Sequence, residues 1–314
     1  MLLLRAGAAS AQINSGFYRF YSFDIIKTQP LVVLLQEENP KELKKLANKP
    51  EELADYKGAI AYYNKQIQLL APRFWKFSPS VEFQPESALK EIRAAKGRRT
   101  VVLRYEKHTN GASSPGNNSY FIGSRQVASM ELTTPGNGDE NYELSSPAPL
   151  DVVYPSDMVF AFRYIQQRLA QDMQRKARVE AGRDRQDIQR EERAEEEAEV
   201  AANLALIRTR TLLIAENDLD PKLSAEGIKQ FYPYPYQVVP RAAIEAAVQA
   251  GDNRYIYARR LAMSVELIGP FLIDAANSHL LARSASGGIR GGNSKLIGKD
   301  DFQDYVNYVK NNSK

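Results

Sequence analysis

Short apolar runs alternate with amphipathic stretches along this chain of 314 residues. The runs FYSFDII, PLVVLL and RTLLIAE are aromatic or β-branched and are bounded by polar residues or proline, which predicts buried strands. In residues 39–72 the apolar side chains instead recur every three or four positions, which predicts a helical face turned to the core. Pro40 and Pro50 stand where prolines of a first helical turn are expected. The predicted core face consists of Leu53, Tyr56, Ile60, Tyr63, Ile67 and Leu70.

The same order of elements occurs twice. An aromatic strand (FWKFSPSVEF), a helix opened by Pro85 and the strand RTVVLRYEK have counterparts in YPYPYQVV, a helix from Pro240 and RYIYARRLAMSVELI. The final helix KDDFQDYVNYVKN likewise mirrors PSDMVFAFRYIQQRL. This layout predicts an α/β (α+β) fold of two similar tandem units joined by a long charged helix. The alternative is that α/β chains resemble one another in outline.

These elements divide the chain into four segments. Residues 1–12 form a signal-like segment, 13–155 the first α/β unit, 156–207 a long charged helix or helical hairpin, and 208–314 the second unit. Two stretches rich in Gly, Asn, Ser or Pro, HTNGASSPGNNS and PGNGDENYELSSPAP, are predicted to be loops.

Residues 175–199 have the most biased composition of the chain. They carry seven basic and nine acidic side chains, with arginine concentrated in the first half and glutamate in the second. A helix without an apolar face depends on charge pairs three or four residues apart, each worth only about 0.2–0.5 kcal/mol. The pattern therefore predicts an exposed helical spacer, a hairpin broken at Gly182, or a partly disordered segment. We expect it to project from the body and to contact a protein partner or a second copy.

The overall composition excludes several classes of protein. A hydrophobic fraction of 43% and a charged fraction of 25% are ordinary for soluble domains, and no apolar run approaches a membrane span. The formal charge of +4 is spread along the chain, whereas nucleic-acid binders concentrate such charge in one stripe, so nucleic acid is disfavoured as a partner. The chain has no cysteine, which excludes disulfides, thiolate nucleophiles and thiolate zinc sites.

The amino terminus has one feature of a secretory signal. Ala9-Ser10-Ala11 precedes Gln12 and matches the small-x-small pattern of a signal-peptidase site, but the hydrophobic run before it is only Leu2–Leu4. We interpret it as a truncated signal peptide, which places the protein in the periplasm or outside the cell. A frayed terminus and an amphipathic organelle presequence are the alternatives.

The sequence predicts no catalytic, metal or cofactor site. His108 and His279 lack a neighbouring carboxylate or histidine at metal-ligand spacing and are interpreted as exposed turn residues. The acidic residues of KDDFQDY stand at a helix start, where carboxylates cap free N–H groups. No nucleophile elbow, zinc-protease motif or dinucleotide fingerprint occurs.

Two segments are candidate binding surfaces. Tyr232, Tyr234 and Tyr236 alternate along a predicted strand, so their rings could stack on bases or sugars if exposed; core packing is the competing interpretation. The loop SASGGIRGGNSK could bind an anion through glycine N–H groups, Arg290 and Lys295, although a mobile hairpin loop is favoured. The third candidate binding residue is His108, in the predicted loop HTNGASSPGNNS.

The second half resembles a class of periplasmic α/β domains. The order of strand, helix, YQVVPRAAIEAAV, strand pair, FLIDAANSHLLARS and closing helix is similar to that of the TolB amino-terminal domain, the curli-secretion lipoprotein and the penicillin-binding-protein activator lipoproteins. The lipoprotein cysteine is absent, so lipid anchoring does not carry over. The resemblance implies a non-enzymatic envelope protein that binds other proteins. The alternatives are an enzyme of unrecognised type and a glycan or nucleic-acid binder that uses the aromatic strand and basic surface.

Overall fold

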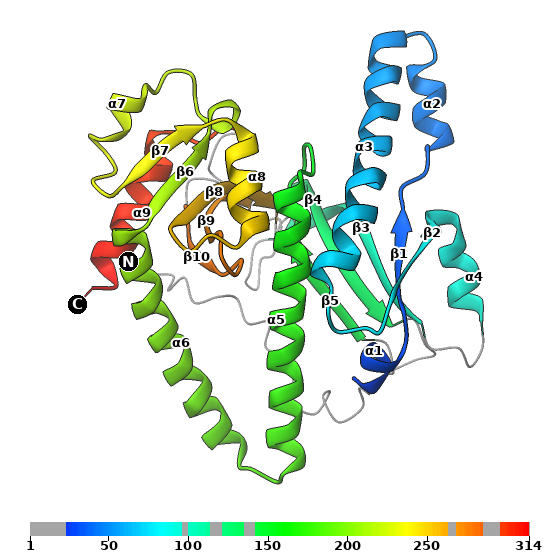
Figure 1. Cartoon of the computed structure of the whole chain (residues 1–314), viewed down its shortest axis with the longest axis horizontal. Coiled ribbons are helices and arrows are strands. Elements are labelled where there is room, and N and C mark those ends of the chain that lie inside the picture. The colour runs from blue at the N-terminus through cyan, green and yellow to red at the C-terminus, as the bar shows by residue number, and fades with distance from the viewer. Residues whose placement is uncertain are drawn as a thin grey trace.

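Two five-stranded sheets, flanked by helices, make up the body of the computed structural model (Figure 1). It describes residues 23–95, 100–113, 121–134, 142–262, 268–284 and 296–313. The first sheet contains β1 (Leu31–Leu35), β2 (Val81–Pro85), β3 (Val101–Ser113), β4 (Phe121–Thr134) and β5 (Tyr142–Pro147). The second contains β6 (Thr211–Ala215), β7 (Tyr236–Val239), β8 (Tyr255–Ala262), β9 (Ile268–Asp274) and β10 (Leu280–Arg283).

The helices follow the predicted proline punctuation closely. They are α1 (Asp24–Thr28), α2 (Pro40–Leu46), α3 (Pro50–Phe74), α4 (Leu89–Ala94), α5 (Pro155–Glu180), α6 (Arg185–Thr209), α7 (Ala225–Ile228), α8 (Arg241–Ala250) and α9 (Lys299–Asn311). Pro40 and Pro50 begin α2 and α3 as expected. Within the described ranges, no helix combines the length and the apolar character needed to cross a bilayer.

Both sheets have the same strand order and the same register. The first runs β2-β1-β3-β4-β5 and the second, read from its other edge, β7-β6-β8-β9-β10. Leu31 pairs with Val81 and Val101, and its counterpart Leu212 pairs with Tyr236 and Ile256. In each sheet the first three strands are parallel and the last two pairings antiparallel. The predicted α/β fold of two similar units is confirmed.

The helices α4 and α8 occupy equivalent places, each connecting the second strand of its sheet to the third. Leu89 and Ile92 of the α4 region pack on the face of the first sheet that carries Val32, Leu34 and Val102. In the second unit α8 contributes Ile244, Ala247 and Val248 to the core. Its end is defined by Gly251, whose φ of +66° lies in the left-handed region that favours glycine.

Several local predictions were wrong. The run FYSFDII was expected to be a strand. Residues 20–22 of it lie outside the described residues, and Asp24–Thr28 forms α1, in which only Ile26 is buried. Residues 142–147 of the expected loop form β5, because they complete the edge of the first sheet beside β4. The aromatic strands begin only at Val81 and at Tyr236.

The predicted core face of α3 is buried only in its second half. Tyr63, Ile67 and Leu70 are buried, whereas Leu53 and Ile60 are half-exposed. The amino half of α3, with α2 beside it, extends beyond the edge of the first sheet (Figure 1). The apolar spacing therefore predicted the helix correctly, but the first sheet covers only the second half of its apolar face.

The charged connection is not one helix. It consists of α5 and α6, which meet at a turn containing Gly182 with φ +72° and form a V (Figure 1). The hairpin alternative, broken at Gly182, is the one that the structure adopts. The left-handed backbone at this turn explains why glycine ends the charged run of α5.

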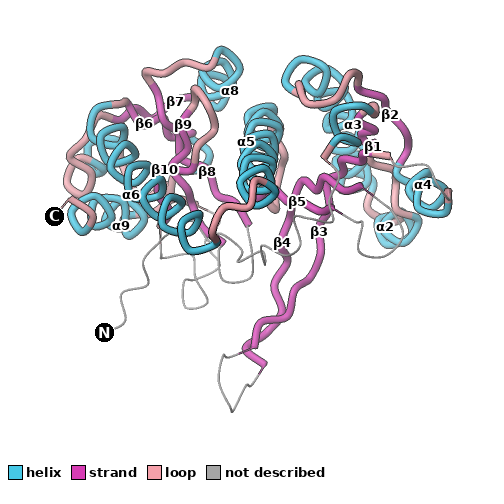
Figure 2. Tube along the Cα trace, turned by 90° about the horizontal axis from the view of Figure 1, so that it is seen from below, coloured by secondary structure: helices cyan, strands magenta, loops and turns pink. Residues whose placement is uncertain are grey.

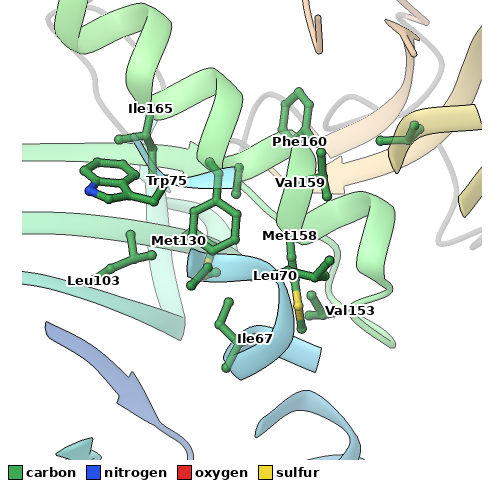
Figure 3. Packing of buried hydrophobic residues seen from close by; sticks show 14 of the residues in the cluster. Ile67, Leu70, Trp75, Leu103, Met130, Val153, Met158, Val159, Phe160 and Ile165 are labelled. Carbon is green, nitrogen blue, oxygen red and sulfur yellow. The ribbon is translucent and has the colours of Figure 1, made fainter. Parts of the chain in front are cut away.

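A continuous hydrophobic core joins the two units through α5. This helix lies between α3 on one side and α8 on the other (Figures 1 and 2). Figure 3 shows Met158 of α5 beside Leu70 of α3, and Ile165 of α5 beside Trp75. The same cluster of buried side chains includes Tyr257 and other residues of the second unit. The amino half of α5 is thus a shared core element, although the predicted boundary at 155/156 assigned it to the connection.

Candidate functional site: a buried charged junction

Charged side chains converge at the carboxyl ends of the parallel strands of the second sheet. Asp218 follows β6, Arg241 begins α8 after β7, and Arg259 lies within β8. Arg241 forms an ion pair with Asp218, and Nη1 of Arg259 lies 3.5 Å from Oδ2 of the same carboxylate. This edge of an open α/β sheet is where ligands commonly bind.

The first unit completes this cluster with the segment that leads from β5 into α5. Arg259 donates from Nε and Nη2 to the two carboxylate oxygens of Asp157, at 2.9 and 3.0 Å. Its Nη2 also donates to the carbonyl oxygen of Val152 at 2.7 Å and lies 3.3 Å from Asp151 Oδ1. The guanidinium group of Arg259, in the second unit, is therefore bound by several oxygen atoms of the first unit.

Tyr154 lies between the two arginines. Its ring centroid is 4.7 Å from the guanidinium carbon of Arg241 and 5.1 Å from that of Arg259. Cations over an aromatic face are attracted by the ring quadrupole, more strongly when water is excluded. The backbone N–H of Tyr154 donates to Asp157 Oδ2 at 2.8 Å, so the same carboxylate also caps α5.

Arg259 remains a cation although only 2% of its side chain is exposed. Burial acts to lower its pKa, but the carboxylates of Asp157, Asp151 and Asp218 outweigh this effect and raise the pKa. A buried ion pair adds little net stability when formed, but loss of one partner leaves a buried charge and costs about 3–5 kcal/mol. The pair therefore constrains how the two units meet.

Glu245 of α8 forms a second polar contact with α5. Its carboxylate accepts the backbone N–H of Ser156 at 2.6 Å and the hydroxyl of Ser156 at 2.8 Å. Burial raises the pKa of Glu245 to about 7, with Asp157 acting in the same direction and the Ser156 hydrogen bonds opposing it. A carboxyl with such a pKa suits general acid–base catalysis, but both oxygens here are engaged by Ser156.

Further contacts continue along α5 and between the sheets. Arg163 donates to the carbonyl of Ala275 at 3.1 Å, and Gln167 donates to that of Asn277 at 2.5 Å. The amide of Ala262 donates to the carbonyl of Ala148 at 3.0 Å in an isolated bridge between the two sheets. The junction thus extends from the first turn of α5 to its middle.

The arrangement favours a structural role over a chemical one. The carboxylates of Asp157 and Asp218 are bound by arginines, and the phenol of Tyr257 is fully buried, which raises its pKa well above the usual value. In the part of the chain that the structure describes, no group of three or more His, Asp or Glu side chains could hold a metal ion.

Of the three tyrosines of the predicted aromatic ladder, one is buried and two are half-buried. Tyr232 is fully buried, and its ring packs edge-on against Tyr234 and Tyr236 at centroid distances of 5.3 and 6.4 Å. Only Tyr236 lies in β7, and the rings of Tyr234 and Tyr236 are half-buried against the same core as Phe302. Tyr232 is thus a core residue that packs against Phe302 of α9, whereas Tyr234 and Tyr236 keep part of their rings at the surface.

The other candidate residues are not brought together with the junction. The backbone of His108 lies in β3, opposite Val127, and not in the predicted loop, because the β3–β4 hairpin extends far beyond the body (Figure 2). Arg290 and Lys295 lie outside the described residues. His279 Nδ1 is 3.7 Å from Glu199 of α6.

One of the acidic residues at the start of α9, Asp301, caps that helix, as predicted. Asp301 Oδ2 accepts the N–H of Gly298 at 2.8 Å. Asp304, one turn further on, accepts the hydroxyl of Ser284 at 2.8 Å.

Sequence reasoning missed all of the junction residues. The signal that could have pointed to them is Arg259-Arg260 inside the otherwise apolar strand that follows Tyr255, since a charge in a buried strand requires a partner. No family model matches the chain, and no curated protein or solved structure matches it. Its function must therefore be inferred from its own residues and geometry.

Proposed function

We propose that this protein is a non-enzymatic scaffold of the cell envelope that acts through protein–protein contacts. The contact surface is the helical V, which we define as residues 175–199 at the meeting ends of α5 and α6. The observation that carries the proposal is that this projection is ordered by its own ion pairs while adding almost nothing to the core.

The arms of the V pair with each other. Arg175 Nε lies 3.2 Å from Glu192 Oε1, Arg178 Nη2 lies 2.9 Å from Glu195 Oε1, and Arg183 is paired with Glu191. The basic residues come from the α5 side and the acidic residues from α6. The graded charge of the sequence is thus used in antiparallel pairing, which was one of the expected arrangements.

Stability of the body does not require such a projection. Ile188, which is 3% exposed, is the only buried side chain of the V. Exposed ion pairs contribute about 0–1 kcal/mol each. Arg193, Glu196 and Glu197 are exposed on α6 and are free to meet another molecule. A charged surface on a fixed support suits recognition of a protein partner or of a second copy.

The envelope assignment is supported by the small-residue motif at Ala9–Ala11 and by the layout that resembles periplasmic α/β domains. Fractionation of source cells tests it. The native protein should appear with periplasmic or secreted markers, and recovery with cytoplasmic markers would refute the assignment.

A site-specific photo-crosslinker tests the contact surface. Placed at Glu197 on the V, it should give a discrete adduct with a partner or a second copy. The matched control is the same group at Lys90 of α4, which is equally exposed but lies outside the V. Equal adducts at both positions, or none at Glu197 in the source cell, would contradict the proposal.

A further inference from the structure

The two units are clamped along parallel helices. Glu245 of α8 meets the first turn of α5, and Gly251 at the end of α8 lies beside Arg163 in the middle of α5, since a Cβ on Gly251 would stand 3.6 Å from Arg163 Nη2. The second unit therefore approaches α5 at both ends of α8. Only the contact at Glu245 depends on a group that can change its charge near neutral pH.

The ionisable groups around Glu245 come from four elements. Asp157 of α5, Arg241 of α8, Tyr62 of α3 and Tyr257 of β8 all interact electrostatically with it. Asp157 is already bound by Arg259, and Arg241 is paired with Asp218. The pKa values of both tyrosines are raised, so neither phenol loses its proton near neutrality.

We propose that Glu245 is a proton-controlled clamp, which holds α8 more firmly against the amino end of α5 when its carboxyl group is protonated. In the protonated form the carbonyl oxygen accepts the Ser156 N–H while the carboxyl O–H donates to the Ser156 hydroxyl oxygen. Both hydrogen bonds are kept and the buried charge is removed. In the ionised form the two bonds also form, but a second negative charge then stands beside Asp157 in a partly dehydrated contact.

The direction of the pH effect follows from linkage. Burial raises the pKa of Glu245 in the folded protein to about 7, from an ordinary value of 4.5. Between these values the folded state binds the proton and the unfolded state does not, so acidification stabilises the contact. This contribution is fully present near the lower value and is lost as the pH rises through about 7. The clamp lies in the junction and not in the V, so it can fail without affecting the proposed partner contact.

Distance measurement between paired spin labels tests the clamp. The chain has no cysteine, so Leu69→Cys on α3 and Ala246→Cys on α8, both at exposed positions, can be labelled selectively. The distance distribution should be narrow at pH 6 and broader or longer at pH 8. In the Glu245→Gln background, which imitates the neutral acid, it should be narrow at both pH values.

Two further variants give the controls. Glu245→Asp keeps the charge but shortens the side chain, so the distribution should be broad at both pH values. His279→Gln removes a histidine that lies beside Glu199 of α6, away from the contact between α8 and α5, and should leave the pH dependence unchanged. Identical distributions at pH 6 and 8 in the parent, or a pH response that persists in Glu245→Gln, would overturn the proposal.

Discussion

Arg104 and Arg259 occupy the same register position in the two sheets, three residues beyond the equivalent pair Val101 and Ile256. Arg104 pairs within its own unit, with Glu131 Oε2 at 2.9 Å and with Glu106. Arg259 reaches out of its unit to Asp157, 102 residues away in the chain. The arginine at this sheet position thus forms ion pairs within its own unit in the first sheet, and contacts the other unit in the second sheet.

Loss of Arg259 should therefore be costly. We expect Arg259→Met to lower the free energy of unfolding by about 3–5 kcal/mol, because Asp157 is left as a buried, uncompensated carboxylate. Urea denaturation measures this. Arg104→Met is the matched control and should cost less, since its partner Glu106 is 33% exposed and its buried partner Glu131 keeps the hydrogen bond from the Ser129 hydroxyl. Equal losses would mean that Arg259 does not constrain the junction as described.

Combining Arg259→Met with Asp157→Leu should recover part of the loss. The double variant contains no orphaned charge, so it should be more stable than Arg259→Met alone. If the losses of the single variants Arg259→Met and Asp157→Leu add up to the loss of the double variant, the two side chains are not energetically coupled.

Shortening the V should leave the body intact. Replacing residues 177–190 with a short Gly/Ser loop removes exposed ion pairs and the single buried side chain Ile188, so no more than about 3 kcal/mol should be lost. Thermal unfolding followed by circular dichroism checks this, while crosslinking from the remaining part of α6 should fall. A large drop in Tm would show that the V stabilises the units.

The pH dependence of stability should follow Glu245. The folded-state pKa of about 7 predicts that the free energy of unfolding contains a term that decreases from pH 6 to pH 8. Urea titrations of the parent and of Glu245→Gln at both pH values isolate this term by difference. A slope that is unchanged by the substitution would assign the effect to another group.

Tyr232 distinguishes a core from a recognition surface. Tyr232→Ala should lower the free energy of unfolding by about 3–5 kcal/mol, the range for a large aromatic side chain lost from a core. Tyr232→Phe should change it by about 1 kcal/mol or less, because the buried hydroxyl has no hydrogen-bond partner among the described residues. A severe loss in the phenylalanine variant would indicate a hydroxyl partner.

Much of the fold could be predicted from local pattern. Proline at the first turn of α2, α3 and α5 and glycine after α8 act through their own backbone preferences, so they define helix ends wherever they occur. The prediction of a strand just before Lys27 failed because a short aromatic stretch has no periodicity that distinguishes a strand from a helix. Its environment decides, and here Ile26 packs into the core as part of α1.

The junction could not be predicted because it depends on pairing across distant parts of the chain. The position of Arg259 opposite Asp157 follows from the way that α5 lies between the sheets, and no local spacing encodes this. Glu245 and Ser156, 89 residues apart, present the same problem. A charged residue in a buried strand indicates that an oppositely charged partner exists, but the sequence does not show which residue that partner is.

The outer flank of α4 has a consequence for assembly. In the second unit the equivalent helix α8 is covered by α5, but α4 exposes Lys90, Glu91 and Arg93 to solvent. Arrays of stacked repeats end where a terminal unit presents a polar flank that no neighbour can cover. A further copy stacking on α4 would therefore have to bury three charged side chains, whereas α5 covers α8 with apolar ones.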